Sequence, residues 1–566
     1  MNCSTRFKLT TVALLVGSAM NANAALYKVV EVDPALNGSS STYNDAYGVA
    51  IQQGDVAFET GCFANGANCT DDQFKLALET RVSVDGVSYR EELPFAMDAT
   101  FGYIQEFDDF ERYCYNELRY STCETWASIH WAPWYKELSK DYTSNALAFV
   151  ERDPDAGEEE PNAYQNKYNN VINSLTSSGL PVGNQSVLKD DKTDLETRNT
   201  VVAPVTPQGD FYQSRAWKTD GTYTVGSVSS KTGNENGTHY TSKAAIWDAA
   251  GVVKQLDWPQ VADRDGERLA QGSMRDVVVD STNNKVYGVG YNTYADDNYI
   301  NASVFVGTFD ASGTFENSSW DTKQVSGAQM KISGDIIHSN SVVTNVNSNF
   351  IAIGEAKRAG GKPSEGSAAN RLFLVKDVRA ESVSATFLPE LGGIFFSGAG
   401  GKMGGINKYN EIVGQLDAED TREIDGKPRR KRAFILPYEA NGSVESRISI
   451  FDNKAWYLDD LTNGSNAPVE NNQYRIIDAT DINDAGVISA TAIKCEGGYD
   501  TTAHNSYCGE GSQEEKVVAV KLIPIANADA NNIEKRPVEK AAAERSGAGL
   551  GWLSLTLLVL FGFRRK

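Results

Sequence analysis

Histidine is scarce in this sequence, and the motifs of familiar active sites are missing. The 566 residues include four widely spaced histidines, His130, His239, His338 and His504. We find no His-Glu-x-x-His, no Gly-x-Ser-x-Gly and no phosphate-binding glycine loop. The 75 acidic residues offer many chance carboxylate pairs, so the sequence singles out no catalytic residue.

Metal-ligand patterns are equally sparse. Asp263–Glu267 resembles a fragment of a calcium loop but lacks the rest of the EF-hand pattern, so an acidic surface turn is the simpler interpretation. Bound calcium has no other support, and we predict no cofactor and no metal site.

Positive charge is also in deficit, with 53 Lys and Arg against 75 Asp and Glu and a formal net charge of −22. Such a surface repels nucleic acid and anionic membranes, so we expect no nucleic-acid partner.

The first 24 residues have the pattern of a signal peptide. Arg6 and Lys8 precede an apolar stretch, and small residues lead to a cleavage site between Ala24 and Ala25. The apolar stretch is shorter than the roughly 20 residues that a membrane anchor needs. We therefore predict export, with signal peptidase as a partner and Ala25 as the mature N-terminus.

The cysteines fit an exported protein. Once Cys3 is removed, six remain in three close pairs: Cys62 and Cys69, Cys114 and Cys123, and Cys495 and Cys508. Local pairing is the simplest of the 15 connectivities, and disulfides form in oxidising compartments. Zinc binding competes poorly, because no pair has Cys-x-x-Cys spacing and no histidines cluster nearby.

One pattern recurs along the chain: a polar turn, a short apolar strand, a polar loop and a second apolar strand. Its clearest copy has the turn and first strand at Ile406–Gly414 and the second strand at Arg432–Leu436. The charged segment between them, Gln415–Lys431, is expected to be a solvated loop. Related copies begin at Val346, 60 residues earlier, and at Ile482, 76 residues later, and weaker ones lie at Asp280–Gly288, Thr219–Gly226 and Ile51–Phe58.

Hairpin units at this spacing favour a mainly β fold, a β-propeller of about six or seven blades. An ordinary β protein with Asn- and Gly-rich turns is the alternative. Propellers are commonly closed by pairing strands from the two ends of the chain, so we expect Ala25–Val32 and Val517–Ile525 to share a blade.

The recurring pattern resembles the HAF-type repeat of bacterial extracellular proteins, in which an Ile-Asn-x-x-Gly turn and a Val-Val-Gly strand precede His-Ala-Phe and another strand. Here Arg432 stands where that repeat has its histidine. Most of the chain also resembles a family of secreted gammaproteobacterial proteins of unknown function, a resemblance that implies no activity.

Residues 98–188 interrupt the β pattern. Aromatic residues recur there at helical spacing, and we predict a mostly helical insertion with a short helix near Tyr164–Leu175. The aromatic rings of Trp126, Trp131 and Trp134 suit carbohydrate binding, but packing of the insertion against the propeller is the simpler interpretation.

The C-terminal end resembles a GlyGly-type sorting signal. After a polar linker, Ala526–Ser546, come a glycine-rich entry at Gly547, an apolar run to Phe563 and three basic residues. The resemblance implies cleavage between Ser546 and Gly547 by a rhomboid-like sorting protease (rhombosortase), with membrane contact only through this segment beforehand. A plain tail anchor is the alternative.

The predicted organisation is a signal peptide (1–24), a first propeller segment (25–97), the insertion (98–188), the remaining repeats (189–525), the linker (526–546) and the sorting or transmembrane segment (547–566). We expect a surface-displayed or released binding or adhesion module for an extracellular glycan or envelope protein. The alternatives are a secreted hydrolase or lyase with its site at the central channel, and a purely structural envelope protein.

Overall fold

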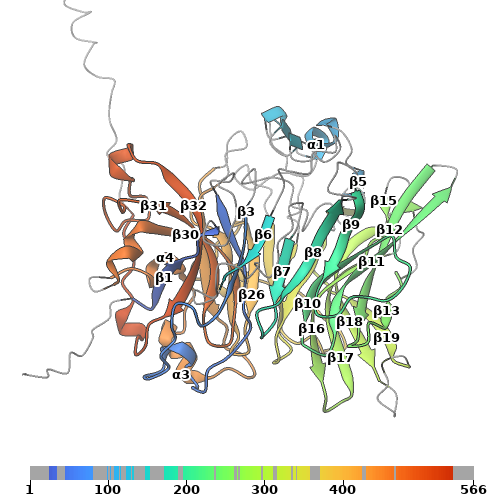
Figure 1. The fold of residues 1–566 in the computed structure, drawn as a ribbon, viewed down its shortest axis with the longest axis horizontal. Coiled ribbons are helices and arrows are strands. Elements are labelled where there is room, and N and C mark those ends of the chain that lie inside the picture. The colour runs from blue at the N-terminus through green and yellow to red at the C-terminus, as the bar shows by residue number, and fades with distance from the viewer. Residues whose placement is uncertain are drawn as a thin grey trace, which may run out of the picture.

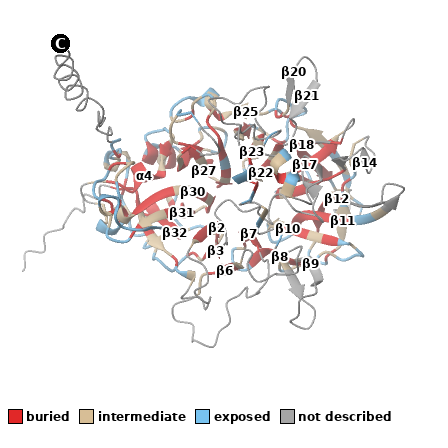
Figure 2. Cartoon of the chain, turned by 90° about the horizontal axis from the view of Figure 1, so that it is seen from above, coloured by how far each residue is buried: buried red, intermediate tan, exposed pale blue. Residues whose placement is uncertain are grey.

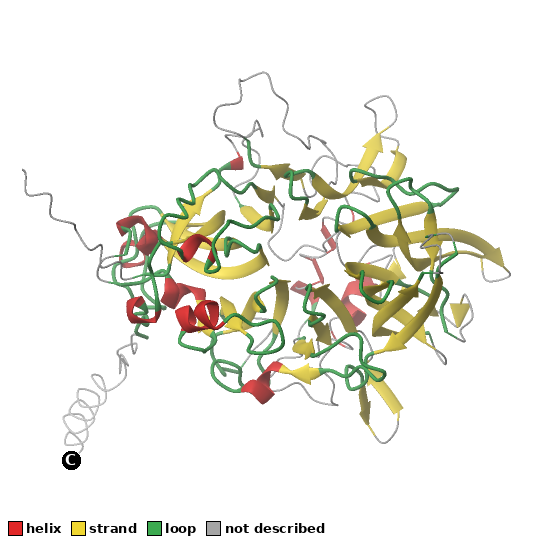
Figure 3. Ribbon diagram, turned by 90° about the horizontal axis from the view of Figure 1, so that it is seen from below, coloured by secondary structure: helices red, strands yellow, loops and turns green. Residues whose placement is uncertain are grey.

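The computed structural model shows a β-propeller of seven antiparallel blades around a central axis (Figures 1 and 2). It describes residues 25–538, except for 35–44, 81–97, parts of 100–146, 153–170, 189–194, 357–369, 423–428 and several gaps of one to five residues. Seen from below, the strands form a ring and most helical turns lie on one side of it (Figure 3). The predicted fold class is confirmed, with seven blades.

We number the blades in chain order. Blade 1 contains β2 (Ala46–Ile51), β3 (Leu76–Thr80) and β6 (Leu147–Val150); blade 2, β7 (Val171–Leu175), β8 (Pro181–Leu188) and β9 (Leu195–Val202); blade 3, β10 (Gln213–Thr219), β11 (Thr224–Asn234), β12 (Gly237–Trp247) and β13 (Val253–Gln255); blade 4, β16 (Ser273–Asp280), β17 (Lys285–Tyr294), β18 (Tyr299–Thr308) and β19 (Ser319–Gln324). Blade 5 contains β22 (Ser341–Val346), β23 (Ala352–Ala356), β24 (Arg371–Val375) and β25 (Thr386–Phe387); blade 6, β26 (Gly401–Ile406), β27 (Glu411–Asp417), β28 (Lys431–Pro437) and β29 (Trp456–Tyr457); blade 7, β30 (Tyr474–Ile482), β31 (Ile488–Cys495), β32 (Glu515–Pro524) and β1 (Tyr27–Glu31).

Blade 7 closes the ring with strands from both ends of the chain. β1 pairs with β32 from Tyr27 opposite Pro524 to Glu31 opposite Val520. The expectation that the two terminal strands share a blade is therefore confirmed. Pairing them removes the open edge that a linear array of sheets would leave.

The first strand of every blade lies at the centre, where it contacts the first strands of the two neighbouring blades. Each of these strands carries a β-bulge where it pairs with the second strand of its blade. A bulge places an extra residue in one strand and re-aims the side chains beside it. The bulges lie between Gly48 and Ala50, Ile172 and Ser174, Ala216 and Lys218, Met274 and Asp276, Val343 and Asn345, and Met403 and Gly405, and in β30 at two places, the second between Ala479 and Asp481.

The recurring turn of the sequence joins the first and second strands of a blade, and its asparagine explains the repeat. The side-chain amide of Asn347 donates to the carbonyl of Asn407 at 2.9 Å, Asn407 donates to Asn483 at 3.1 Å, and Asn483 donates to Gln52 at 3.0 Å. These bonds link blades 5, 6, 7 and 1. The side-chain oxygens meanwhile accept backbone N–H groups of their own turns, so one residue type caps its turn and joins the next blade.

The fourth residue of the turn has a left-handed backbone, which accounts for the glycine of the pattern. Gly486 has φ +90°, and Asn410 and Phe350 occupy the same place with φ +62° and +64°. The sixth predicted copy, Ile51–Phe58, is wrong beyond its first residues. Ile51 ends β2, as Ile406 and Ile482 end the first strands of blades 6 and 7, but the next strand begins only at Leu76, after a loop that holds a disulfide.

The predicted helical insertion needs correction. The helix α1 (Phe107–Tyr113) and the small hairpin β4 (Asp98–Ala99) and β5 (Gly102–Tyr103) belong to it. From Leu147 onward, however, the described residues form strands of blades 1 and 2, and Val171–Leu175 is the inner strand β7 rather than a helix. Burial between two neighbouring inner strands decided its conformation over the helical spacing of the local sequence.

The charged segment Gln415–Lys431 is not simply a solvated loop. Asp417 is fully buried, and both Arg429 and Lys431 form ion pairs with it. A carboxylate can be buried when two cations pair with it, whereas an unpaired carboxylate would be too costly to bury.

The remaining elements are short. Two further hairpins are β14 (Arg264–Asp265) with β15 (Arg268–Leu269), and β20 (Met330–Ile332) with β21 (Asp335–His338). The helix α3 (Glu445–Ile448) lies within blade 6, between β28 and β29, and α4 (Leu458–Leu461) lies between blades 6 and 7. Within the described ranges, no helix is both long and apolar enough to cross a membrane. The predicted linker is described as far as Val538, and this part packs against blades 6 and 7, with Ala528 and Arg536 buried.

Candidate functional site

The predicted site residues are spread over the molecule. The disulfides Cys62–Cys69 and Cys495–Cys508 are present. Cys123 is also disulfide-bonded, whereas its predicted partner Cys114 lies outside the described residues.

Of the three tryptophans proposed for ligands, only Trp131 is described. It is half-buried and packs edge-on against Phe110, with 5.9 Å between the ring centroids. Trp126 and Trp134 lie outside the described residues, as do the processing residues Ala24, Ser546 and Gly547, the histidine His130 and the side chains of His239 and His338. Ala25 is buried at the start of the described chain, and cleavage before it stays a prediction.

A pocket of about 690 Å³ lies at the rim of the propeller, between blade 6, a loop of blade 7 and the C-terminal segment. One part of its wall is apolar and the other is charged. The apolar lining includes Leu391, Ile394, Phe395, Trp456, Tyr457 and Val538. The charged lining comprises Arg430, Arg432, Lys454, Lys535, Arg536, His504, Glu419 and Asp460.

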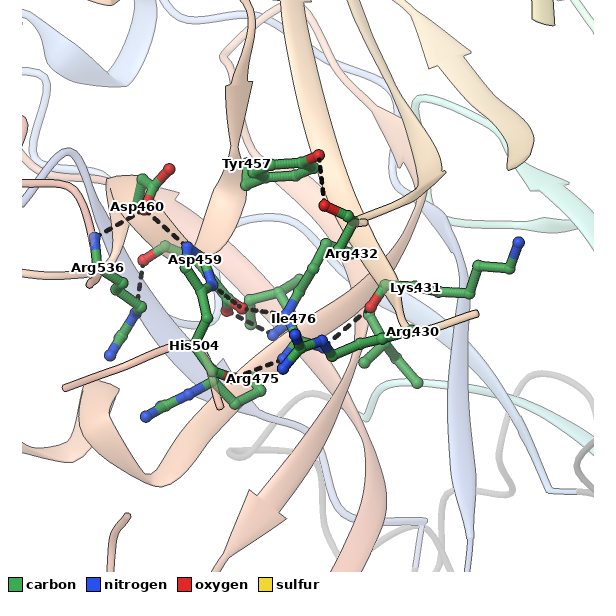
Figure 4. Close-up of polar contacts among 12 residues, drawn as sticks. Arg430, Lys431, Arg432, Tyr457, Asp459, Asp460, Arg475, Ile476, His504 and Arg536 are labelled. Atoms are coloured by element: carbon green, nitrogen blue, oxygen red, sulfur yellow. Dashed lines mark hydrogen bonds and ion pairs between the residues drawn. The ribbon is translucent and has the colours of Figure 1, made fainter. Parts of the chain in front are cut away.

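Asp459 is buried behind the lining of this rim pocket, beside the lining residues Arg432 and His504 (Figure 4). It follows β29 at the start of α4 and is fully buried. One carboxylate oxygen accepts the backbone N–H of Ile476 at 2.7 Å, and the other lies 2.9 Å from Nε of Arg432. Burial alone would raise the pKa of Asp459, but the adjacent His504 ring and the charge of Arg432 outweigh it and lower the pKa, so the carboxylate stays ionised.

His504 lies between two carboxylates. Its Nε2 is 3.1 Å from Asp460 Oδ1, and its Nδ1 is 3.6 Å from Asp459 Oδ2. Burial works to lower the pKa of His504, yet the nearby Asp459 carboxylate and the hydrogen bond to Asp460 prevail and raise it above 6.5. With a carboxylate beside each ring nitrogen, the charged imidazolium is favoured and a role as general base is disfavoured.

The loop that carries His504 is held by arginines through its backbone carbonyls. Arg475 donates to Ala503 at 2.9 Å and Thr501 at 3.1 Å, Arg536 donates to Thr502 at 3.0 Å, and Arg432 donates to His504 at 2.8 Å. The Cys495–Cys508 disulfide closes the same loop at its base. This arrangement keeps several guanidinium groups close together around only two aspartates.

The arginines around this loop repel one another, and this repulsion adds to burial in lowering the pKa of two of them. Burial, followed by the charge of Arg536, lowers the pKa of Arg475 to about 10. Burial and the neighbouring Arg432 likewise lower the pKa of Arg430. Both groups remain charged at neutral pH. An added anion would be stabilised here by cations that the protein leaves only partly neutralised.

Three cations at the mouth of the pocket are held less firmly than those of the floor. Arg430 pairs with Glu419, whose side chain is partly exposed, and Lys454 pairs with the exposed Asp452 at 2.5 Å. The ammonium of Lys535 lies over the ring of Trp456, 5.2 Å from its centroid. Exposed ion pairs of this kind contribute little and exchange readily, so these cations are available to a ligand.

The end of the central channel near the recurring turns carries a second charged group, contributed by three inner strands. Lys218 Nζ lies 3.0 Å from Asp276 Oδ2, and the charges of Asp276 and Asp481 overcome the effect of burial to raise the pKa of Lys218. Both carboxylates accept backbone N–H groups of the following blade, Asp276 from Val346 at 3.0 Å and Asp481 from Ile51 at 3.2 Å. Asp276 and Asp481 therefore link neighbouring blades through these hydrogen bonds.

Sequence reasoning missed the rim pocket. It noted Arg432 only as a departure from the repeat and treated Arg429–Lys431 as part of a solvated loop. A run of four basic residues at 429–432 in so acidic a chain was the available signal. In the part of the chain that the structure describes, no three His, Cys, Asp or Glu side chains are arranged to hold a metal ion.

Comparison with known proteins gives a family but no activity. A family model described as "Protein of unknown function (DUF3466)" matches residues 4–206 and 210–566. The search of curated proteins returned no match.

Two solved structures are weakly similar to this chain in fold. A protein titled "Glycoside hydrolase" has 10% identity and a TM-score of 0.23, covering 59% of this chain and 94% of that one. The Bombyx mori GH32 beta-fructofuranosidase BmSUC1 has 8% identity and a TM-score of 0.18, covering 44% and 53%. At these TM-scores the likenesses carry no functional argument.

Proposed function

The chain belongs to this family of proteins of unknown function, and we propose that it is an exported binding protein whose rim pocket takes an anionic glycan, with carboxylate or sulfate groups. The observation that carries the proposal is a local reversal of charge. Five Arg and Lys side chains and His504 line the pocket with two carboxylates, Glu419 and Asp460. Two further carboxylates, Asp459 and Asp452, pair with Arg432 and Lys454, which still leaves a local excess of positive charge in a chain with a net charge of −22. A cluster of cations that faces solvent attracts anions.

The apolar part of the wall favours a sugar over a small inorganic anion. Tyr457, which is partly exposed, supplies aromatic surface beside the cations, as a sugar ring with one apolar face requires. The volume of about 690 Å³ lies within the range of ordinary small-ligand sites. Arginine forks pair well with carboxylate and sulfate oxygens.

Binding fits this geometry better than catalysis. Among the described residues that line the pocket, His504 is the one histidine, and the carboxylates beside both of its ring nitrogens make it a poor base. The alternative of a hydrolase or lyase at the central channel would use Asp276 and Asp481. Both already accept hydrogen bonds from neighbouring blades, which accounts for them structurally.

Titration calorimetry with oligogalacturonate and with its methyl ester tests the proposal. The two ligands share a sugar backbone and differ in charge. We expect binding only of the free acid, and Arg430→Gln to weaken it at least about ten-fold, the value of a charge-assisted hydrogen bond. Lys243→Gln, a cation on blade 3 remote from the pocket, is the control. Equal binding of acid and ester, or no effect of Arg430→Gln, would refute the proposal.

Export is a separate part of the proposal and has its own test. It is supported by the signal-peptide pattern and by the disulfides, which form in oxidising compartments. Cells and medium are fractionated and the terminal masses of the native protein are measured. A chain that begins at Ala25 and ends near Ser546 in the medium supports processing and release, whereas an intact chain with Met1 in the cytoplasm would contradict export.

A further inference from the structure

The mouth of the rim pocket carries two exposed lysines and two exposed apolar side chains. We call Leu391, Lys454, Lys535 and Val538 the docking rim; all four line the pocket. The side chain of Lys454 is 64% exposed, and Val538 and Leu391 are 59% and 39% exposed. Cations beside exposed apolar groups are the combination found where proteins rest on the headgroup region of a membrane.

The chain leaves the described fold at this same place. The segment up to Val538 is fixed by buried contacts. Arg536 is 4% exposed; its backbone N–H donates to Asp460 at 2.8 Å, and its side chain donates to the carbonyl of Asp459 at 2.8 Å. His504 in turn donates its backbone N–H to Pro537 at 2.9 Å. The point of exit is therefore held against the pocket.

A short tether separates this exit from the apolar C-terminal segment. Residues 539–546 lie between Val538 and Gly547, and eight residues span at most about 28 Å when fully extended. If the apolar run to Phe563 is inserted in a bilayer, the docking rim cannot be further than that from the membrane surface. A tether of this length gives an effective concentration of the order of millimolar, so even a weak contact is populated.

We infer that the docking rim seats the tethered propeller on anionic lipid headgroups of the membrane that holds its C-terminal segment. The inference uses the cations of the pocket and so rests in part on the proposed function. The acidic remainder of the protein does not prevent it. Repulsion between exposed charges is screened beyond about 10 Å at 0.1 M salt, while the rim itself is in contact. The propeller would thus stand with blades 6 and 7 toward the membrane.

Amine labelling of the full-length chain in vesicles tests this orientation. The chain is reconstituted into phosphatidylcholine vesicles, with and without 30 mol% phosphatidylglycerol, and acetylated with a water-soluble reagent. Mass spectrometry gives the labelling rate at each lysine. Lys243, on blade 3, is a matched internal control. Its ammonium lies over a tryptophan ring, 5.0 Å from the centroid of Trp258, just as the ammonium of Lys535 lies 5.2 Å from the centroid of Trp456.

We expect labelling of Lys454 and Lys535 to slow at least three-fold in the anionic vesicles alone, with Lys243 unchanged. Lys454→Gln should remove most of the protection of Lys535, because the loss of one basic residue weakens binding to an anionic surface about five-fold. Equal rates in both vesicles, failure of the chain to float with either, or equal protection by inorganic phosphate would overturn the inference.

Soluble oligogalacturonate without vesicles separates this inference from the proposed function. If the glycan protects Lys535 and the anionic vesicles do not, docking is wrong and the glycan site stands. If the vesicles protect and the glycan does not, the docking rim stands and the glycan site is wrong.

Discussion

Replacing Asn407 with alanine should destabilise the propeller more than the loss of a turn cap can explain. The side chain of Asn407 is 3% exposed and makes four hydrogen bonds. It accepts from the backbone N–H groups of Tyr409 and Glu411 at 3.0 and 3.1 Å, and donates to the Asn483 carbonyl at 3.1 Å and the Glu411 carboxylate at 2.6 Å. Two of these bonds cap its own turn, one reaches the next blade, and one holds a buried carboxylate.

The magnitude follows from the buried groups left without partners. Each buried donor or acceptor that loses its bond costs about 1–3 kcal/mol, and Glu411 keeps its ion pair with Arg447, so we expect about 4 kcal/mol in all. Unfolding entropy of about 2.1 cal/mol/K per residue gives roughly 1 kcal/mol/K for a domain of this size. The corresponding fall in Tm is about 4 °C if the ring unfolds as one unit.

Asp220→Ala is the matched control. Asp220 caps the equivalent turn of blade 3, where it accepts from Thr222 at 2.8 Å and Tyr223 at 2.7 Å, but it is exposed. Water can replace its bonds, so we expect a loss of about 1 kcal/mol and about 1 °C. Differential scanning calorimetry of the disulfide-intact protein measures both. If Asn407→Ala lowers Tm no more than Asp220→Ala, the asparagine links between blades contribute nothing.

Three further predictions concern blades 1, 6 and 7. Serine at both Cys495 and Cys508 should release the loop that carries His504, lowering stability by about 3 kcal/mol and oligogalacturonate affinity by at least ten-fold; calorimetry that shows unchanged affinity would contradict a positioning role for this disulfide. The folded-state pKa of His504 is raised above 6.5, so the charge of its imidazolium stabilises the fold fully below pH 6.5. Both this stabilisation and the affinity for anions are lost as the pH rises through the raised pKa. His504→Gln should abolish the pH dependence of both quantities. Lys521→Met should leave the Glu151 carboxylate, now 2.8 Å from the Lys521 ammonium, without its partner and cost about 3–5 kcal/mol in urea denaturation, whereas a loss under 1 kcal/mol would show that water replaces the pair.

Local sequence determined the repeating unit. The asparagine turns, the short apolar strands on either side and the close cysteine pairs depend on residues near one another in the chain, which is why they could be read without the structure. The two terminal strands were also predictable, since a closed ring needs one strand from each end. The insertion was misread from Leu147 onward. Val171–Leu175 forms a hairpin with the adjacent strand β8, but its burial depends on contacts with β2 and β10, the inner strands of the neighbouring blades, which are distant in sequence.

Only the tertiary structure decided where the charges meet. Arg432, Asp459, His504 and Arg536 are spread over more than 100 residues, and closure of the ring brings blades 6 and 7 and the C-terminal segment together around them. An ionised side chain is stable in the interior only beside specific partners, and its sequence neighbours do not say which partners those will be. Short-range backbone chemistry therefore determined the blades of this protein, and long-range packing of charge determined the pocket.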